Sequence, residues 1–248
     1  MKKSVRLEYM DCIICGSGEN EVAFRKYGYD VVRCRRCGFV YMNPLPGREE
    51  VEGKYLTRGF RPKEERIGRR LKYRFLVRLI EHYAKKRGEF LDIGCSIGDF
   101  GIALQGRPRW RYHGIDLNPG IPAHNVRKLR ISIGTLEDHR FKDGQFAVVT
   151  MWHVLEHIRN PRSTLLEVRR VLRDEGLLAL IVPDVSHHRV RYLGTRWKYL
   201  GPPDHLWYFA PRSLHTLLEA AGLSVVFTWR SWFKTHLMMF ARRVSGEW

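Results

Sequence analysis

The stretch from Glu89 to Gly101 constrains the fold more than any other part of the sequence. It opens with a short apolar run, which predicts a buried strand. The glycines Gly94, Gly98 and Gly101 follow, and they allow a tight turn that a ligand can approach closely, because glycine has no side chain. Ile102-Ala103-Leu104 then begins a helix. A strand, a glycine turn and a helix N-terminus together predict a cofactor-binding corner in an open α/β sheet.

Asp116 is a second sign of the same corner. Trp110 to Ile115 predicts the next strand, and Asp116 stands at its end, where a carboxylate can accept hydrogen bonds from two ribose hydroxyls. A nicotinamide dinucleotide site needs the spacing G-x-G-x-x-G, which the glycines here do not have. Asp92, just before the glycines, also fits a pyrophosphate poorly, whereas it suits a cationic, amine-bearing ligand.

Leu91 to Gly98 resembles the cofactor loop of class I S-adenosylmethionine-dependent methyltransferases, and the resemblance extends over about residues 63 to 243. Ser96 departs from the family, which most often has glycine there. The alternative is a Rossmann-like domain that has lost its ligand, and residues 136 and 137 could equally belong to an ordinary loop. The resemblance implies S-adenosyl-L-methionine as cofactor, with the cofactor-binding residues Asp92, Gly94, Cys95, Ser96, Gly98, Asp116, Leu117, Leu136, Glu137 and Trp152.

Two cysteine pairs, Cys12-x-x-Cys15 and Cys34-x-x-Cys37, lie near the start of the chain. Four thiolates at this spacing fit a zinc ribbon with a tetrahedral ion. Disulfides are the alternative, but the N-terminus lacks the pattern of a signal peptide, which argues against an oxidising compartment. We therefore expect a separate zinc-ribbon module over residues 1–45, with a structural zinc ion that takes no part in chemistry.

The rest of the chain predicts an α/β fold, because strand and helix patterns alternate. The last two strands, 223–229 and 235–241, lack an intervening helix and should pair as an antiparallel edge. We expect a Rossmann-like, seven-stranded, mostly parallel sheet with an antiparallel edge strand, in addition to the ribbon. The expected methyltransferase domain, 46–248, divides into a basic helix 63–86, a core 89–183, a substrate lid 184–210, and a C-terminal helix and strands 211–243.

The expected helix over residues 63–86 has an apolar and a basic side. Its basic side is either a solvated face or an anion-binding surface. The apolar stripe at four-residue spacing is Ile67, Leu71, Phe75, Leu79 and Tyr83, with Leu76 and Ile80 beside it. The basic residues are Arg66, Arg69, Arg70, Lys72, Arg74 and Arg78.

The net charge indicates an anionic partner. The 248 residues hold 44 Lys and Arg against 26 Asp and Glu, a net charge of +18. Such an excess favours nucleic acid, a sugar nucleotide or a membrane surface as partner. No apolar run approaches the length that a transmembrane helix needs, so we expect no membrane span and a cytoplasmic location.

The segment after the fourth strand, Trp152 to His157, lies where open α/β sheets bind their ligands. Methyl transfer often needs a base that takes the acceptor's proton, and an imidazole pKa of about 6.5 suits that task. We expect His153, His157 and His205 to be catalytic, in proton or metal chemistry.

A divalent metal at this segment is a further hypothesis. The pattern H-x-x-E-H resembles E-x-x-E-H of ubiquinone-pathway O-methyltransferases and small-RNA 2′-O-methyltransferases, with His153 in place of the first glutamate. The ligands would be His153, Glu156, His157 and His205, and histidine favours a softer metal. The alternative is structural, with capping or backbone contacts, and so short a motif favours it over a metal.

Two features that the sequence lacks exclude some classes of methyl acceptor. No [DN]-P-P-[YF] segment follows the fourth strand, and no cysteine is left over as a nucleophile for pyrimidine methylation. The basic and aromatic insertion 184–204 suits a phosphorylated or nucleotide-linked acceptor. We expect methyl transfer to a small anionic metabolite, such as a sugar or cell-envelope precursor. An RNA methyltransferase and a non-catalytic nucleic-acid-binding scaffold are the alternatives.

Overall fold

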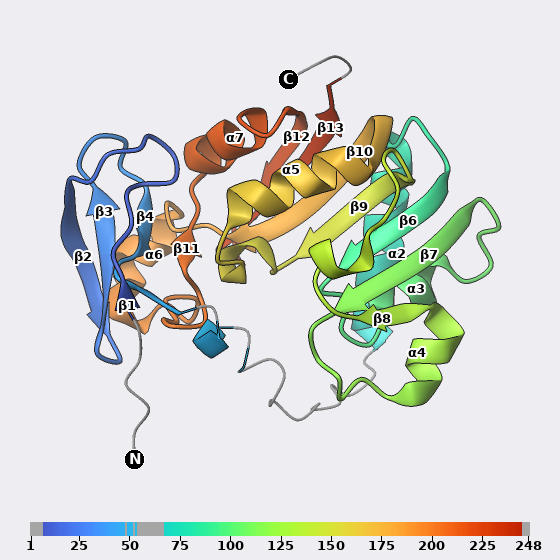
Figure 1. Ribbon diagram of the computed structural model, residues 1–248, viewed down its shortest axis with the longest axis horizontal. Helices are drawn as coiled ribbons and strands as arrows, with labels where there is room; N and C mark the ends of the chain where they lie inside the picture. Colours follow the sequence, from blue (N-terminus) through green and yellow to red (C-terminus); the bar gives the residue numbers. More distant parts are fainter. Residues whose placement is uncertain (1–6, 48, 52, 54–66, 245–248) are drawn as a thin grey trace.

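The computed structural model describes residues 7–47, 49–51, 53 and 67–244. Figure 1 shows a large twisted sheet with helices on both faces, and a smaller sheet formed mainly by the N-terminal residues beside it. The carboxyl ends of β9 (Phe146–Trp152) and β10 (Leu172–Pro183) point towards the smaller sheet (Figure 1). In the described residues no helix is long and apolar enough to span a membrane.

The large sheet has seven strands within the described part of the chain, in the order β12-β13-β10-β9-β6-β7-β8. The pairs from β10 to β8 are parallel, while β13 runs antiparallel to both of its neighbours. This confirms the expected fold, and it places the antiparallel strand between β10 and the edge strand β12. The remaining strands are β6 (Gly88–Ile93), β7 (Trp110–Asp116), β8 (Ile131–Ile133), β12 (Leu223–Arg230) and β13 (His236–Arg243).

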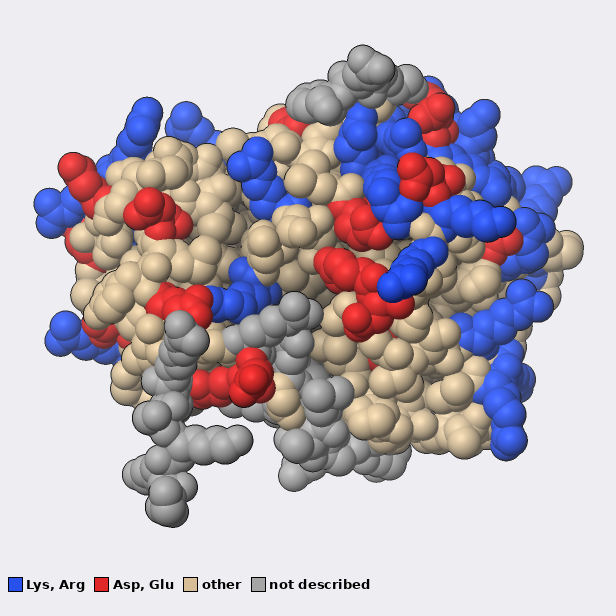
Figure 2. Space-filling view, viewed as in Figure 1, with Lys and Arg blue, Asp and Glu red and all other residues tan. Residues whose placement is uncertain are grey.

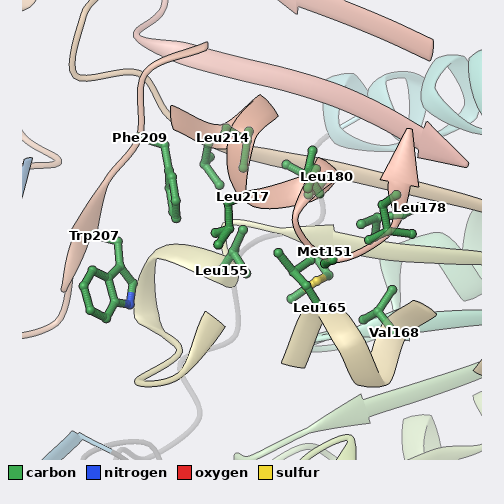
Figure 3. Close-up of a cluster of buried hydrophobic side chains, with 14 of the residues drawn as sticks. Met151, Leu155, Leu165, Val168, Leu178, Leu180, Trp207, Phe209, Leu214 and Leu217 are labelled. Atoms are coloured by element: carbon green, nitrogen blue, oxygen red, sulfur yellow. The ribbon is translucent and has the colours of Figure 1, made fainter. Parts of the chain in front are cut away.

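The helices cover two distinct apolar layers. Side chains of β10 alternate between them: Leu178 and Leu180 face one layer, Leu177 and Ala179 the other. In Figure 3, α5 and α7 pack their leucines against the first layer. The helices are α2 (Ile67–Tyr83), α3 (Asp99–Leu104), α4 (Ala123–Leu129), α5 (Pro161–Val171), α6 (His188–Leu193) and α7 (Pro211–Glu219), with 3-10 turns η1 (Glu137–His139), η2 (Leu155–His157) and η3 (Gly194–Arg196).

The apolar stripe expected on α2 is wrong in its details. Leu71 and Phe75 are 59% and 63% exposed, whereas Leu76, Val77 and Ile80 are buried. A four-residue spacing drifts about 40° at each step, because a helix turns about 100° per residue, so the stripe cannot stay on one face. Residues 63–66 of the expected helix lie outside the described residues.

The N-terminal residues do not complete their own sheet. Their strands are β2 (Asn20–Lys26), β3 (Tyr29–Cys34) and β4 (Val40–Met42), and the fourth strand is β11 (Trp207–Tyr208), from the segment expected to be the lid. A short pair, β1 (Leu7–Glu8) with β5 (Leu45–Pro46), lies alongside.

The segment of β11 covers apolar side chains of the small sheet. The three N-terminal strands alone would leave these side chains exposed. Trp207 stacks on Phe39 and Tyr41 with ring centroids 6.2 Å away in each case. These residues and Leu206 belong to the same core cluster as Leu91 and Val149 of the large sheet. The expected boundary at residue 45 therefore does not separate two cores.

Candidate active site

The turn after β6 lies at the carboxyl edge of the sheet, where β6 has β7 on one side and β9 on the other. Gly94, Ser96 and Gly98 have φ values of 67°, 52° and 80°. A Cβ on Gly94 would lie 2.4 Å from Val154 Cγ2, so glycine is required there for both conformation and space. The serine that departs from the family pattern adopts the left-handed conformation, which glycine would adopt without strain.

Asp116 holds this turn to the end of β7. Its Oδ2 accepts a hydrogen bond from the backbone N–H of Ser96 at 2.8 Å, and its Oδ1 accepts one from Asn118 at 2.9 Å. Each carboxylate oxygen has a second lone pair, which leaves capacity for two ribose hydroxyls. The structure thus brings together Gly94, Ser96, Gly98 and Asp116, with Leu117 half-buried next to the acid.

Asp92 lies beneath the turn. It is 3% exposed, and its two oxygens accept hydrogen bonds from Thr150 Oγ1 at 2.7 Å and from the Tyr112 hydroxyl at 3.1 Å. Burial raises the pKa of Asp92 to about 7, against the opposing effect of these hydrogen bonds. Its carboxyl group therefore supports the turn from inside, where the sequence had suggested direct contact with the cofactor.

Asp92→Asn is expected to stabilise the fold increasingly as the pH rises. The unfolded carboxyl ionises near 3.8 and the folded one near 7, so wild-type stability falls between these values and levels off above them. Between about pH 5 and pH 8 the free energy of unfolding of the variant should rise by on the order of 3 kcal/mol relative to that of wild type. This figure corresponds to the roughly two pH units between pH 5 and the folded pKa, at about 1.4 kcal/mol per unit. Denaturant titrations without cofactor would measure this.

The matched control for this titration is Asp143→Asn, because Asp143 is exposed and pairs with Arg170. Its effect on stability should change little across the same pH range. A stability difference for Asp92→Asn that is independent of pH would contradict the raised pKa of Asp92.

The other expected cofactor residues differ in exposure. Cys95 is buried with Leu129 and Ile131, and burial raises the pKa of its thiol. Leu136 is buried in the main core. Glu137 is exposed and accepts a hydrogen bond from Thr164 Oγ1 at 3.0 Å.

Trp152 stacks on Phe100 of α3, with ring centroids 5.2 Å apart. Its indole Nε1 is buried and has no hydrogen-bond partner among the described residues. A buried donor of this kind requires an acceptor, and a polar group of a bound cofactor would supply one.

Glu156 is the centre of a histidine cluster at the end of β9. The side chain is fully buried, and its Oε1 lies 3.2 Å from His153 Nδ1 and 4.0 Å from His157 Nε2. His157 Nδ1 lies 2.7 Å from the carbonyl oxygen of Asp204, to which it donates. With its proton on Nδ1, His157 carries its lone pair on Nε2, the form that suits a base or a metal ligand.

His205 lies against His157, with ring centroids 4.5 Å apart at an interplanar angle of 88°. Ligand atoms of Glu156, His157 and His205 lie within 4.8 Å of one another. His205 Nδ1 and Glu156 Oε2 are buried without a hydrogen-bond partner among the described residues. Burial lowers the pKa of His205 to about 4, so this imidazole is neutral near pH 7.

The structure therefore assembles three of the four residues that the sequence suggested for a divalent metal. His153 is outside the group of three and bonds to Glu156 instead. A buried carboxylate and two imidazoles are a suitable donor set for a divalent ion, and the two orphaned polar atoms are consistent with one.

The sequence did not indicate Tyr199 and His236 as parts of this cluster. Tyr199 stacks on His153 with ring centroids 5.7 Å apart, and its hydroxyl bonds to His236 Nε2. The His236 ring lies 4.8 Å from that of His153. His236 begins β13 opposite Pro183, the last residue of β10. The sequence did contain one signal for His236. The last predicted strand is antiparallel, so its first residues lie at the sheet edge where the parallel strands end.

The four cysteines of the ribbon form a second group. All four Sγ atoms lie within 4.8 Å of one another, and two pairs, Cys12 with Cys37 and Cys15 with Cys34, are 3.5 Å apart. Tetrahedral zinc with Zn–S bonds of about 2.3 Å requires S–S separations of about 3.8 Å. A disulfide requires about 2.05 Å, and the four thiols are free in this structure, so the geometry favours a metal site over disulfides.

The sheet order and the glycine turn with Asp116 define the class I S-adenosylmethionine-dependent methyltransferase fold. A family model described as a methyltransferase domain matches residues 64–227, about two thirds of the chain. The chain belongs to this methyltransferase-domain family.

Individual relatives are more distant. A protein of Mycolicibacterium smegmatis named a probable S-adenosylmethionine-dependent methyltransferase is 27% identical over 185 residues, 73% of this chain and 66% of that protein. A 37.1 kDa protein in transposon TN4556 of Streptomyces fradiae is 31% identical over 110 residues, 41% of this chain and 32% of that protein. The chain thus spans about two thirds of the length of the first of these curated relatives and about one third of the second.

Among solved structures, the [4+2]-cyclase SpnF matches with a TM-score of 0.59 at 16% identity, over 80% of this chain and 91% of that chain. A likeness at this identity shows the fold alone. Because the same fold occurs in a protein named a cyclase, the reaction must be argued from the site.

Proposed function

We propose that this protein transfers a methyl group from S-adenosylmethionine to a small anionic acceptor. The main support for an anionic acceptor is the positive charge of lysine beside the histidine cluster. Burial lowers the pKa of His236 to about 3, and the neighbouring His153 and the charges of Lys198, Lys72 and Lys234 act in the same direction. Lys198 Nζ lies 4.5 Å from the centroid of the Tyr199 ring, and the Tyr199 hydroxyl bonds to His236, so this ammonium group stands where it would suit a carboxylate, phosphate or diphosphate.

S-adenosylmethionine would supply an electrophilic methyl group on a sulfonium. The turn of Gly94, Ser96 and Gly98 would bind it closely, and Asp116 would accept hydrogen bonds from its ribose hydroxyls. Trp152 Nε1 would donate to a polar atom of the ligand, which gives that buried N–H a partner.

His157 is the base that removes the acceptor's proton. Its Nδ1 donates to Asp204, so Nε2 can take a proton from the acceptor. The charge of Glu156 then stabilises the imidazolium, since the neighbouring histidines already hold the pKa of Glu156 below its usual value despite complete burial. His153 bonds to Glu156, and His205 lies within 4.8 Å of it.

A divalent ion at Glu156, His157 and His205 is the second form that we propose for this cluster, and the two orphaned atoms described above support it. Two imidazoles favour zinc, iron or nickel over magnesium. Such an ion would lower the pKa of an acceptor hydroxyl, so the cluster would assist proton removal in either form.

We further propose that Cys12, Cys15, Cys34 and Cys37 hold a structural zinc ion, because their sulfur separations suit a tetrahedral site that has no open position. Burial raises the pKa of the Cys12 thiol, so its ionised form requires a neighbouring cation. Cysteines that bind a metal and form no disulfides suit a reducing compartment, and we propose that the protein acts in the cytoplasm.

The test is transfer of labelled methyl groups from S-adenosylmethionine into an extract of cells that lack the gene. Label is expected in a small-molecule or lipid fraction that binds an anion-exchange resin. Label in RNA that disappears with ribonuclease would replace this acceptor by RNA. Absence of both cofactor binding and label would contradict methyl transfer and leave the scaffold alternative.

Once an acceptor is found, Lys198→Gln combined with Lys234→Gln should raise its KM about tenfold or more, since each charge-assisted hydrogen bond contributes roughly 1 kcal/mol or more. Lys142→Gln is the matched control, because Lys142 is an exposed lysine before β9, at the other end of that strand. An unchanged KM in the double variant would contradict the anionic acceptor.

A further inference from the structure

Exposed aromatic side chains gather on α6, at the end of β12 and on the turn between β12 and β13. We call Tyr192, Trp229, Trp232 and Phe233 the aromatic tip; they are four of the seven exposed aromatic side chains in the described residues. Their exposed fractions are 82%, 45%, 75% and 77%. Single exposed apolar residues are ordinary, but a local group of this size marks an interaction surface.

Two contacts join the two segments of the tip. The ring of His188 lies 5.5 Å from that of Trp232, and Arg189 Nη1 donates to the carbonyl oxygen of Phe233 at 2.6 Å. Tyr192 follows His188 by four residues on α6, so both stand on one face of the helix. The helix and the turn therefore form one surface.

Buried contacts hold the turn from beneath. Ser231 Oγ accepts from the backbone N–H of Lys234 at 2.9 Å, and His187 Nε2 lies 2.8 Å from the Ser231 carbonyl oxygen. Trp197 Nε1 donates to Thr235 Oγ1, at 2.9 Å. The exposure of Trp232 and Phe233 is thus a property of a well-packed turn, since the residues beside them are fixed in the core.

The surroundings of the tip are strongly basic. Segments 184–204 and 228–236 contain two acidic residues, and Asp184 is buried and pairs with Arg230. The exposed basic residues there are Arg189, Arg191, Arg196, Lys198, Arg230 and Lys234. Aromatic rings among arginines and lysines complement an anionic lipid surface, where the rings enter the interface and the cations face the headgroups.

We propose that the aromatic tip docks this protein on the surface of an anionic membrane. Single-stranded nucleic acid is the other ligand of basic aromatic surfaces, and it stacks its bases on rings presented as platforms. Trp232 and Phe233 are adjacent in a turn and three-quarters exposed, which suits insertion of both rings into an interface. The observations therefore favour lipid.

Docking here would place the candidate active site near the lipid surface. The turn leads directly into His236, which bonds to Tyr199 and lies against His153. An acceptor with a lipid tail would then reach the histidine cluster without leaving the membrane. The membrane contact itself depends on the surface residues alone, so it stands independently of the acceptor proposed above.

The test is co-sedimentation of the full chain with vesicles of phosphatidylcholine, with and without roughly 30% phosphatidylglycerol. Wild type should bind the anionic vesicles, and binding should weaken at high salt. Trp232→Ser with Phe233→Ser should reduce binding about tenfold or more, since each ring buries apolar area in the interface. Tyr27→Ser is the matched control, because Tyr27 is 73% exposed on the β2–β3 turn and should not matter.

A second pair of variants tests the charge. Arg191→Gln with Arg196→Gln should reduce binding to anionic vesicles towards that to neutral ones, with the cofactor affinity unchanged. The proposal would be overturned by wild type that does not bind anionic vesicles, or by equal binding of the Trp232 and Phe233 double variant. It would also be overturned if those two substitutions abolished dimerisation or oligouridylate binding and left vesicle binding intact.

Discussion

Cys34→Ser is expected to abolish zinc binding by the ribbon and to destabilise the whole chain. Structural zinc contributes on the order of 10 kcal/mol to the folding of small zinc modules, which is as large as the total stability of a typical domain. The loss should extend beyond the N-terminal residues, because Phe39 and Tyr41 share a core cluster with the large sheet. Metal analysis and thermal unfolding would measure both effects.

Cys95→Ala is the matched control, since Cys95 is a buried cysteine in the cofactor turn and not part of the sulfur group. It should retain the full content of ribbon zinc. If Cys34→Ser bound zinc as wild type does, the ribbon site would be refuted. If it lost zinc with an unchanged unfolding temperature, the ion would have no structural role.

Glu156→Gln is expected to lower the rate of methyl transfer by about a hundredfold or more, the scale of a lost base or its stabilising charge. The substitution preserves shape and removes the negative charge beside His153 and His157. The cofactor affinity should remain, because the glycine turn and Asp116 are untouched. Single-turnover transfer of labelled methyl groups, together with calorimetric titration of the cofactor, would separate the two quantities.

Metal analysis of the same variant distinguishes the two forms of the cluster. If Glu156, His157 and His205 hold an ion, metal content should fall by one ion per chain in Glu156→Gln while the ribbon ion remains. If they act as a proton-transfer group, metal content should not change. Glu219→Gln, on an exposed part of α7, is the control. Full activity in Glu156→Gln would contradict both forms.

The sequence predicted the parts of this fold that depend on local pattern. Alternating strands and helices, the turn at Gly94 and Gly98, and the two cysteine pairs each follow from spacing within a short segment. It could not predict that Trp207 would pair with Tyr41, because a two-residue strand has no periodicity of its own. Likewise, His236 and Tyr199 reach His153 only through the tertiary arrangement.

The net charge also has a partly structural explanation that composition cannot reveal. Figure 2 shows Lys and Arg mainly on the right-hand side of the molecule, which holds β6, β7 and α4 in Figure 1. Three arginines at the sheet edge where β10 begins and β13 ends donate to backbone carbonyl oxygens: Arg173 to Arg87, Arg242 to Tyr83, and Arg243 to Leu172. These residues tie loops together, so the +18 charge overstates the surface available for a partner.

The pairing of β11 with β4 has a consequence for biosynthesis. All four ribbon cysteines lie within the 26 residues from Cys12 to Cys37, so the metal site can load soon after this segment leaves the ribosome. The sheet that surrounds it, however, is complete only when Trp207 and Tyr208 have been synthesised, about 170 residues later, which takes on the order of ten to thirty seconds at bacterial to slower elongation rates. During that interval Phe39 and Tyr41 lack their aromatic partner. A nascent chain of this protein would therefore be most dependent on chaperones until Trp207 and Tyr208 emerge.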